Sequence, residues 1–181
     1  MRLETERLVL RSWEERDRGP LARVLGDPEV RRFYPKALSF EEASAQFDAV
    51  LAKQAEKGFH FGAAELKADG RFVGMIGLGF PADVIRDAIA GRPEVEIGWQ
   101  FDKTFWGQGL APEAARAWLN WGFATAGLDE VVAFTSEGNL PSQRVMEKIG
   151  MRRDPADDFL HPVLPDGHPL RPHVLYRIGK S

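Results

Sequence analysis

The 181-residue sequence contains no cysteine. This absence excludes disulfide bonds, thiolate metal sites and a covalent intermediate on a cysteine nucleophile. There is also no N-terminal hydrophobic signal region and no apolar run long enough to span a membrane, so we expect a soluble cytoplasmic protein with no membrane partner. A formal net charge of −3 argues against a nucleic-acid partner, because contacts to phosphates require a basic surface.

The chain also lacks internal repeats and any linker long enough to divide it. With 44% hydrophobic residues, a chain of this length can bury a hydrophobic core of its own. We therefore predict a single domain over residues 1–181.

A strand, a glycine loop and a helix start follow one another between residues 94 and 126. The strand is predicted because apolar side chains alternate with polar ones, the apolar set being Val95, Ile97, Trp99 and Phe101. The glycine loop is Trp106-Gly107-Gln108-Gly109, and the helix opens at Leu110. Pro112 suits the first helical position, where a missing N–H costs nothing.

Backbone N–H groups at such a helix start form a cradle for phosphate, and the helix dipole favours the negative charge. Two familiar phosphate loops are excluded. The dinucleotide fingerprint needs a glycine where Pro112 stands, and the Walker loop needs a Gly-Lys-Ser/Thr ending that is absent. The alternative interpretation is a plain strand-to-helix turn.

The other segments predict strands and helices around this centre. Ser39 and Glu42 form a capping box that starts a helix, and Asp69-Gly70 predicts a hairpin turn. The strand expected after the central helix should be parallel to the strand before it, because a helix separates them. Strands are predicted at residues 7–11 (of edge type), 59–66, 72–80, 130–135 and 173–178, and a further helix from Asn139 to Gly150. The result is a mixed α/β fold, with a mostly antiparallel sheet, one central parallel pair and flanking helices.

Three segments carry a resemblance to a known family. The central segment EIGWQFDKTFWGQGLAPEA resembles the cofactor-binding motif of the GNAT acetyltransferases, and more narrowly that of the RimJ/RimL-like branch. The opening LETERLVLRSW and the later NLPSQRVMEKIGM are similar to the same branch, in the same order and spacing. The resemblance covers nearly the whole chain and implies an acetyl-CoA-dependent N-acetyltransferase.

The resemblance also implies which residues bind acetyl-CoA. The loop and helix start would hold its pyrophosphate through backbone N–H groups, and the central strand would lie along the pantetheine arm. Trp106 stands where the family more often has Arg or Gln, so packing is the expected role for its side chain. The implied cofactor-binding residues are Trp99, Phe101, Gly107, Gln108, Gly109, Leu110, Ala111, Asn139 and Ser142.

Transfer of an acetyl group to an amine needs a neutral amine, and a base can supply it. Glu96 on the polar strand face is the leading candidate, acting through a water, with Glu94 as runner-up. The structural alternative for Glu96 is a solvated or salt-bridged side chain. Ser142 is the expected donor nearest the thioester sulfur. Met146 stands where many GNAT enzymes have a tyrosine acid, which leaves a weaker role for Ser142 or protonation of the sulfur by water.

The expected acceptor is a primary amine, with the N-terminal amine of a protein or peptide leading. An α-amine has a pKa of about 8 and needs less help from a base than a lysine at about 10.4. The alternatives are a small-molecule amine, such as a polyamine, amino acid or aminoglycoside, and a non-catalytic acyl-CoA sensor. Without cysteine, direct transfer in a ternary complex is favoured over a covalent enzyme intermediate.

Several other residues have two interpretations. Trp13, Phe33, Tyr34 and Pro35 lie in segments that often face the acceptor in this family, but they could equally form core. His60 is expected to be packed in a strand. We expect no metal at His161, His168, His173 and Asp166, because their spacing is irregular. Exposed Trp118 or Trp121 would form a patch for a homodimer, whereas burial would place them in the core.

Overall fold

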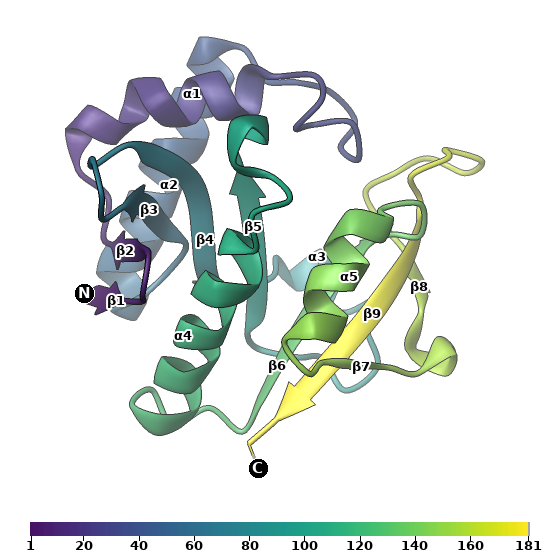
Figure 1. Cartoon of the computed structure of the whole chain (residues 1–181). Helices are drawn as coiled ribbons and strands as arrows, with labels where there is room; N and C mark the ends of the chain where they lie inside the picture. The colour runs from purple at the N-terminus through teal and green to yellow at the C-terminus, as the bar shows by residue number, and fades with distance from the viewer. Residues whose placement is uncertain (181) are drawn as a thin grey trace.

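The computed structural model describes residues 1–180, which form one twisted sheet flanked by helices (Figure 1). The strands are β1 (Arg2–Glu4), β2 (Leu8–Arg11), β3 (Gly62–Leu66), β4 (Phe72–Gly79), β5 (Glu96–Phe101), β6 (Glu130–Ser136), β7 (Arg152–Arg153), β8 (Phe159–Leu160) and β9 (Pro172–Gly179). The helices are α1 (Arg18–Gly26), α2 (Phe40–Lys57), α3 (Asp83–Arg86), α4 (Leu110–Ala124) and α5 (Leu140–Lys148). Within these described residues, no helix has the length and apolar content that a bilayer crossing requires.

The strands run in the order β1-β2-β3-β4-β5-β6-β9-β7, with β8 also paired to β9. All neighbours are antiparallel except β5 and β6, which are parallel. The predicted mixed α/β fold with a central parallel pair is therefore confirmed. The separating helix is α4, which packs back onto β4 and β5.

The prediction of an edge-type first strand is wrong. β2 pairs with β1 on one side and β3 on the other, and all four of its residues are buried. The alternation suggested an exposed face because Arg11 is charged, but its guanidinium lies 2.6 Å from Asp17 and is also paired with Glu65. Long-range ion pairing thus allows a charged residue in an interior strand.

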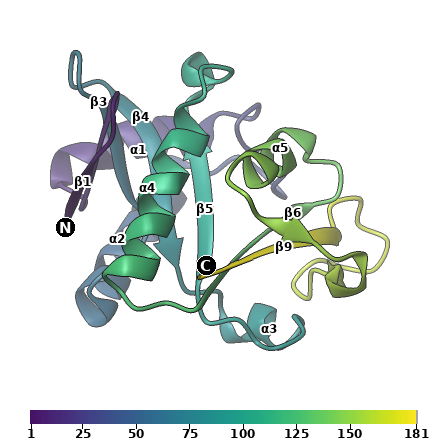
Figure 2. The same cartoon turned by 60° about the horizontal axis from the view of Figure 1, so that its bottom comes forward.

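Helices cover both faces of the sheet (Figure 2). α4 and α5 share the larger core with the sheet, whereas α1 and α2 pack through Leu21 and Phe47 against Ala63 and Met75 on the other side. The capping box of α2 is confirmed, with the Ser39 hydroxyl accepting from the backbone N–H of Glu42.

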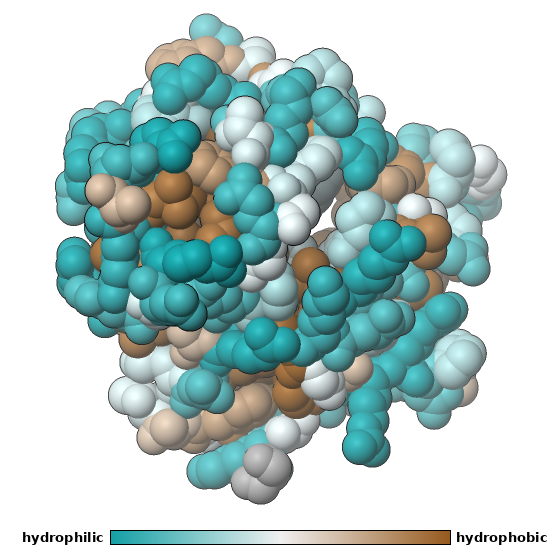
Figure 3. All heavy atoms as spheres, viewed as in Figure 1, coloured by the Kyte–Doolittle hydropathy of each residue, from teal (hydrophilic) through white to brown (hydrophobic). Residues whose placement is uncertain are grey.

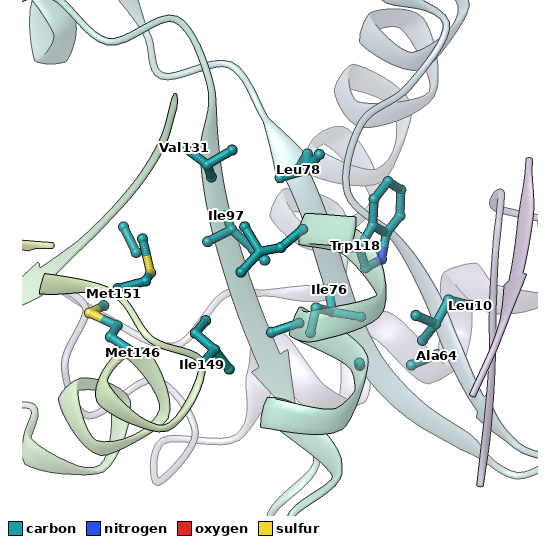
Figure 4. Packing of buried hydrophobic residues seen from close by; sticks show 14 of the residues in the cluster. Leu10, Ala64, Ile76, Leu78, Ile97, Trp118, Val131, Met146, Ile149 and Met151 are labelled. Carbon is teal, nitrogen blue, oxygen red and sulfur yellow. The ribbon is translucent and has the colours of Figure 1, made fainter. Parts of the chain in front are cut away.

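Trp118 of α4 lies in the larger core, near Leu78 and Ile76 (Figure 4). Its side chain is wholly buried, so of the two interpretations left open for Trp118 the core placement applies and the exposed patch does not. Trp121 is half-buried and packs edge-on against Trp118 and Phe59, at centroid distances of 5.6 and 5.3 Å. The helix presents these tryptophans to its own sheet because their spacing places them on the sheet-facing side.

Replacing this central side chain should destabilise the fold strongly. We expect Trp118→Ala to lower the free energy of unfolding by about 3–5 kcal/mol, because the cavity it leaves is lined by rigid strands. Urea unfolding followed by circular dichroism measures this change. Phe40→Ala is the matched control, because Phe40 is 57% exposed, and it should cost less than about 0.5 kcal/mol. Equal effects from both substitutions would contradict the assignment of Trp118 to the core.

Candidate active site

The two parallel strands at the centre of the sheet are joined at one position only. Glu96 of β5 is paired with Val132 of β6, and the Val132 N–H donates to the carbonyl of Val95 at 3.1 Å. Beyond this pair the strands separate toward their carboxyl ends, and a cavity of about 460 Å³ lies there. The corresponding hollow lies between the two halves of the face shown in Figure 3.

The separation leaves one edge of β5 open. The Val95 carbonyl faces β6, and backbone groups alternate along a strand, so the N–H and C=O groups of Trp99 and Phe101 also face the gap. The next residue, Asp102, confirms this alternation, because its N–H points the other way and donates to the Val73 carbonyl of β4. The Phe101 carbonyl accepts from the Trp106 indole at 2.9 Å, so this hydrogen bond fixes the Trp106 ring beside the end of β5.

The glycine loop lies directly beyond this edge. Gly107 and Gly109 have φ of 75° and 76°, left-handed values that side-chain-bearing residues rarely adopt, and Gly109 caps α4. The first helical hydrogen bond runs from Glu113 to the Gly109 carbonyl. Pro112 is therefore the third helical residue and not the first, but it still lies where the N–H has no helical partner.

Five consecutive backbone N–H groups at this helix start are unused. Residues 107–111 donate to no acceptor within the part of the chain that the structure describes. The loop side chains do not fill the space above them, since the Gln108 amide turns back to the Thr104 carbonyl at 3.0 Å. Free backbone N–H groups at the positive end of a helix dipole form an anion-binding site.

Arg7 braces the loop from behind. Its guanidinium donates to the Gln108 carbonyl at 2.8 Å and to the Glu113 carboxylate at 2.7 Å. Thr5 donates to the same carboxylate at 2.5 Å. Sequence reasoning missed these positions, because the contacts join residues more than 100 positions apart and no local pattern marks them.

α5 forms the opposite wall. Asn139 caps this helix by accepting from the Ser142 N–H at 3.3 Å, and its amide donates to Thr135 at 2.8 Å. Asn139, Ser142 and Met146 all line the cavity. The Met146 side chain is buried among core residues, so a thioether stands at this wall and no phenol.

Glu96 lies on the same face of β5 as Gly98 and Gln100, which both line the cavity, although Glu96 itself is not part of that lining. It is half-buried, and no cation within residues 1–180 comes within 4.0 Å of it, so the salt-bridged alternative does not apply. Burial raises the pKa of Glu96 from 4.5 to about 7. Glu94 precedes β5 and is exposed.

The segment between α1 and α2 supplies a third wall. Phe33 and Tyr34 line the cavity, whereas Trp13 is core and donates its indole N–H to the Phe61 carbonyl. Pro35 is exposed and lies outside the lining.

Basic residues that sequence reasoning missed also line the cavity, namely Arg32, Arg144 and Lys148. They were missed because single exposed cations carry no pattern.

The remaining histidines do not form a metal cluster within residues 1–180. His161 and His173 stack at a centroid distance of 4.8 Å, and burial lowers the pKa of His173 to about 4. Asp166 is paired with Arg171. His60 packs on Phe61 as expected but lies just before β3 and not within the strand, and burial lowers its pKa to about 4.

Comparison with known proteins identifies this arrangement. Residues 7–152 match the family model described as "Acetyltransferase (GNAT) domain". The chain therefore belongs to the GNAT family of acetyltransferases. Several similar proteins are named N-acetyltransferases, and this protein is an N-acetyltransferase.

Two similar curated proteins come from Bacillus subtilis. "Uncharacterized N-acetyltransferase YnaD" is 29% identical over 178 residues, which cover 98% of this chain and 96% of that protein. "Uncharacterized protein YkkB" is 33% identical, with 83% and 84% covered. The crystal structure of a GNAT-family acetyltransferase from Bacillus anthracis superimposes with a TM-score of 0.79 at 27% identity, over 99% of this chain and 98% of that one.

The raised pKa of Glu96 has a consequence for stability. Burial disfavours the Glu96 carboxylate in the folded state, so protonation of Glu96 contributes to the free energy of unfolding. This contribution is fully present below pH 4.5 and is lost as the pH rises through about 7. Relative to Glu96→Gln, the wild-type protein should therefore lose roughly 3 kcal/mol of unfolding free energy between these pH values. Urea unfolding of both proteins at pH 4.5, 6 and 8 measures it. A pH-independent difference would show that Glu96 ionises normally.

Proposed function

We propose that this protein is an acetyl-CoA-dependent N-acetyltransferase of the RimJ/RimL-like branch, a single domain that moves the acetyl group directly to a primary amine. The leading acceptor is the N-terminal amine of a protein or peptide. The observation that carries the proposal is the row of five free N–H groups at 107–111, next to the open edge of β5. Together they offer an anion cradle and a strand edge for an extended amide-bearing chain.

The residues present fit acetyl-CoA. Its pyrophosphate matches the free N–H groups of the loop and helix start, and the free backbone groups of Trp99 match the amides of the pantetheine arm. Arg32, Arg144 and Lys148 have no carboxylate within 4.0 Å among residues 1–180, so they can pair with phosphate. When bound, acetyl-CoA supplies an acetyl group activated as a thioester.

Glu96 is proposed as the base. A carboxylate with a pKa of about 7 is half ionised at neutral pH and is strong enough to take a proton from the incoming amine, directly or through a water. Neutralising the amine in this way allows its nitrogen to form the amide bond as the thioester bond breaks. The burial that raises the pKa also removes competing cations from the carboxylate.

Ser142 is proposed to donate to the departing sulfur. Its hydroxyl has no hydrogen-bond partner in the described chain, and it lines the cavity one helical turn before Met146. Two further hydroxyls near α5 are engaged: that of Thr135 accepts from the Asn139 amide at 2.8 Å, and that of Tyr176 contacts Gln143 and Glu147 at 3.4 and 3.3 Å. Because a thiol with a pKa near 8.5 is a good leaving group, a modest donor suffices.

Binding of acetyl-CoA is tested by a charge placed beside the cradle. We expect the wild-type protein to bind acetyl-CoA with a micromolar Kd by calorimetry and Gly109→Glu to bind at least about a hundredfold more weakly, because a carboxylate next to the free N–H groups repels the pyrophosphate. Gly127→Glu is the control, since Gly127 has a similar φ of 71°, a side chain added there meets open space, and it lies beyond the far end of α4.

Two outcomes would contradict this expectation. Equal weakening in Gly109→Glu and Gly127→Glu would show that backbone strain, and not the anion cradle, is responsible. No heat with the wild-type protein and an unchanged melting temperature would remove the proposed co-substrate altogether. Binding without release of CoA over a panel of amines would instead identify a sensor.

The base is tested by the dependence of rate on pH. With a serine-starting tetrapeptide, kcat/KM should rise with pH until Glu96 is ionised near 7, and Glu96→Gln should lose this limb and about a hundredfold in rate. The assay follows release of the CoA thiol. Glu94→Gln is the comparison, because this exposed carboxylate should not contribute. A larger loss in Glu94→Gln than in Glu96→Gln would overturn the assignment.

A further inference from the structure

Arg31 is a buried cation in the segment between α1 and α2. Its side chain is 8% exposed, and it donates to the side-chain oxygen of Gln100 at 3.0 Å and to the Lys36 carbonyl at 3.2 Å. The guanidinium carbon lies 3.8 Å from the centroid of the Tyr34 ring. Arg31 therefore stands directly behind Gln100 and Tyr34, two residues that line the cavity.

No counter-charge accompanies this cation. Within residues 1–180 no carboxylate lies within 4.0 Å of Arg31, and its Nη2 atom donates to nothing. Burial accordingly lowers the pKa of Arg31. The contrast within the same chain is Arg11, which is equally buried but paired with Asp17 and Glu65. Buried charges in proteins are normally paired, so the site at Arg31 lacks an anion.

Two neighbours of Arg31, Gln100 and Tyr34, line the cavity, so the Arg31 side chain is next to the proposed acceptor side. Gln100, which holds Arg31, shares a face of β5 with Glu96 four residues away, which corresponds to roughly 13 Å along the strand. Burial raises the pKa of Tyr34, the Arg31 charge lowers it and the Glu96 charge raises it, so the phenol senses both.

We propose that the acceptor carries an acidic group, which Arg31 receives while the amine reaches Glu96. This inference rests on the proposed function and specifies its substrate class. Because Gln100, which holds Arg31, and Glu96 are four residues apart on β5, the acid and the amine of the acceptor must be separated by several bonds. The carboxylate of a free α-amino acid lies directly beside its amine and does not meet this requirement. An acidic side chain on the second residue of a peptide does, as does a small compound with its amine and acid at opposite ends.

The alternative role for Arg31 is a tether that only holds its segment on β5. A tether would affect folding and the rate with every acceptor alike, whereas an acceptor-binding cation affects only acidic acceptors. The discriminating quantity is therefore a ratio of kcat/KM values within each variant, and not an absolute rate.

The experiment compares matched acceptors. The peptide pair is Ser-Asp-Gly-Gly-amide and Ser-Asn-Gly-Gly-amide, and the small-molecule pair is 4-aminobutanoate and butylamine. We expect the wild-type protein to prefer the acidic member of at least one pair about tenfold in kcat/KM, and the pair concerned identifies the source of the acid. Arg31→Gln should bring the ratio near one by slowing the acidic acceptor only. Arg31→Lys, which keeps the charge, should retain part of the preference.

Arg23→Gln is the matched control, because Arg23 is an exposed arginine on neighbouring α1, and the wild-type ratio should persist there. A wild-type ratio near one in both pairs would overturn the proposal, as would a preference that survives Arg31→Gln. If Arg31→Gln does not fold, as a melting curve would show, Arg31→Lys and the wild-type ratios decide. Failure of all four amines, despite acetyl-CoA binding, would overturn the proposed function and this inference with it.

Discussion

The single backbone pair between Glu96 and Val132 is the constraint on which the site depends. β5 is fully paired to β4 over six residues, and β6 is fully paired to β9 over seven. Each central strand is therefore held by its outer neighbour, and the two halves of the sheet can separate beyond that one pair. Because the strands separate, the backbone N–H and C=O groups on the open edge of β5 have no strand partner. Such unpaired groups are tolerated where a ligand can supply the missing hydrogen bonds.

The glycine loop is placed by the same constraint. It continues from the open edge of β5, so the strand edge and the start of α4 border one cavity. Side chains could have closed the opening, but Gly107 and Gly109 have none, and the Gln108 amide is turned away. Arg7 and Glu113 fix the loop from the side that faces the first strands. The cradle is thus preformed by contacts outside it.

The alternation of β5 divides the roles of its residues. Ile97, Trp99 and Phe101 turn their side chains to the core under α4 and their backbone groups to the gap. Glu96, Gly98 and Gln100 face the opposite side, where Gly98 lies against Phe61 and the Gln100 side-chain oxygen accepts from Arg31. One strand therefore separates an anion-binding side from a side that carries a carboxylate and a buried cation, and residues of both faces line the cavity.

The sequence by itself determined the local structure and the family. The alternation in β5, the capping box of α2, the Asn139 cap and the two glycines each depend on near neighbours in the chain, so their patterns predicted the elements and the confirmed mixed α/β fold. The tertiary structure decided what depends on distant pairing. It placed β2 inside the sheet, buried Trp118, braced the loop through Arg7, raised the pKa of Glu96 and left Arg31 without a counter-charge. Burial and charge pairing arise from residues brought together across the whole chain, and no local spacing encodes them.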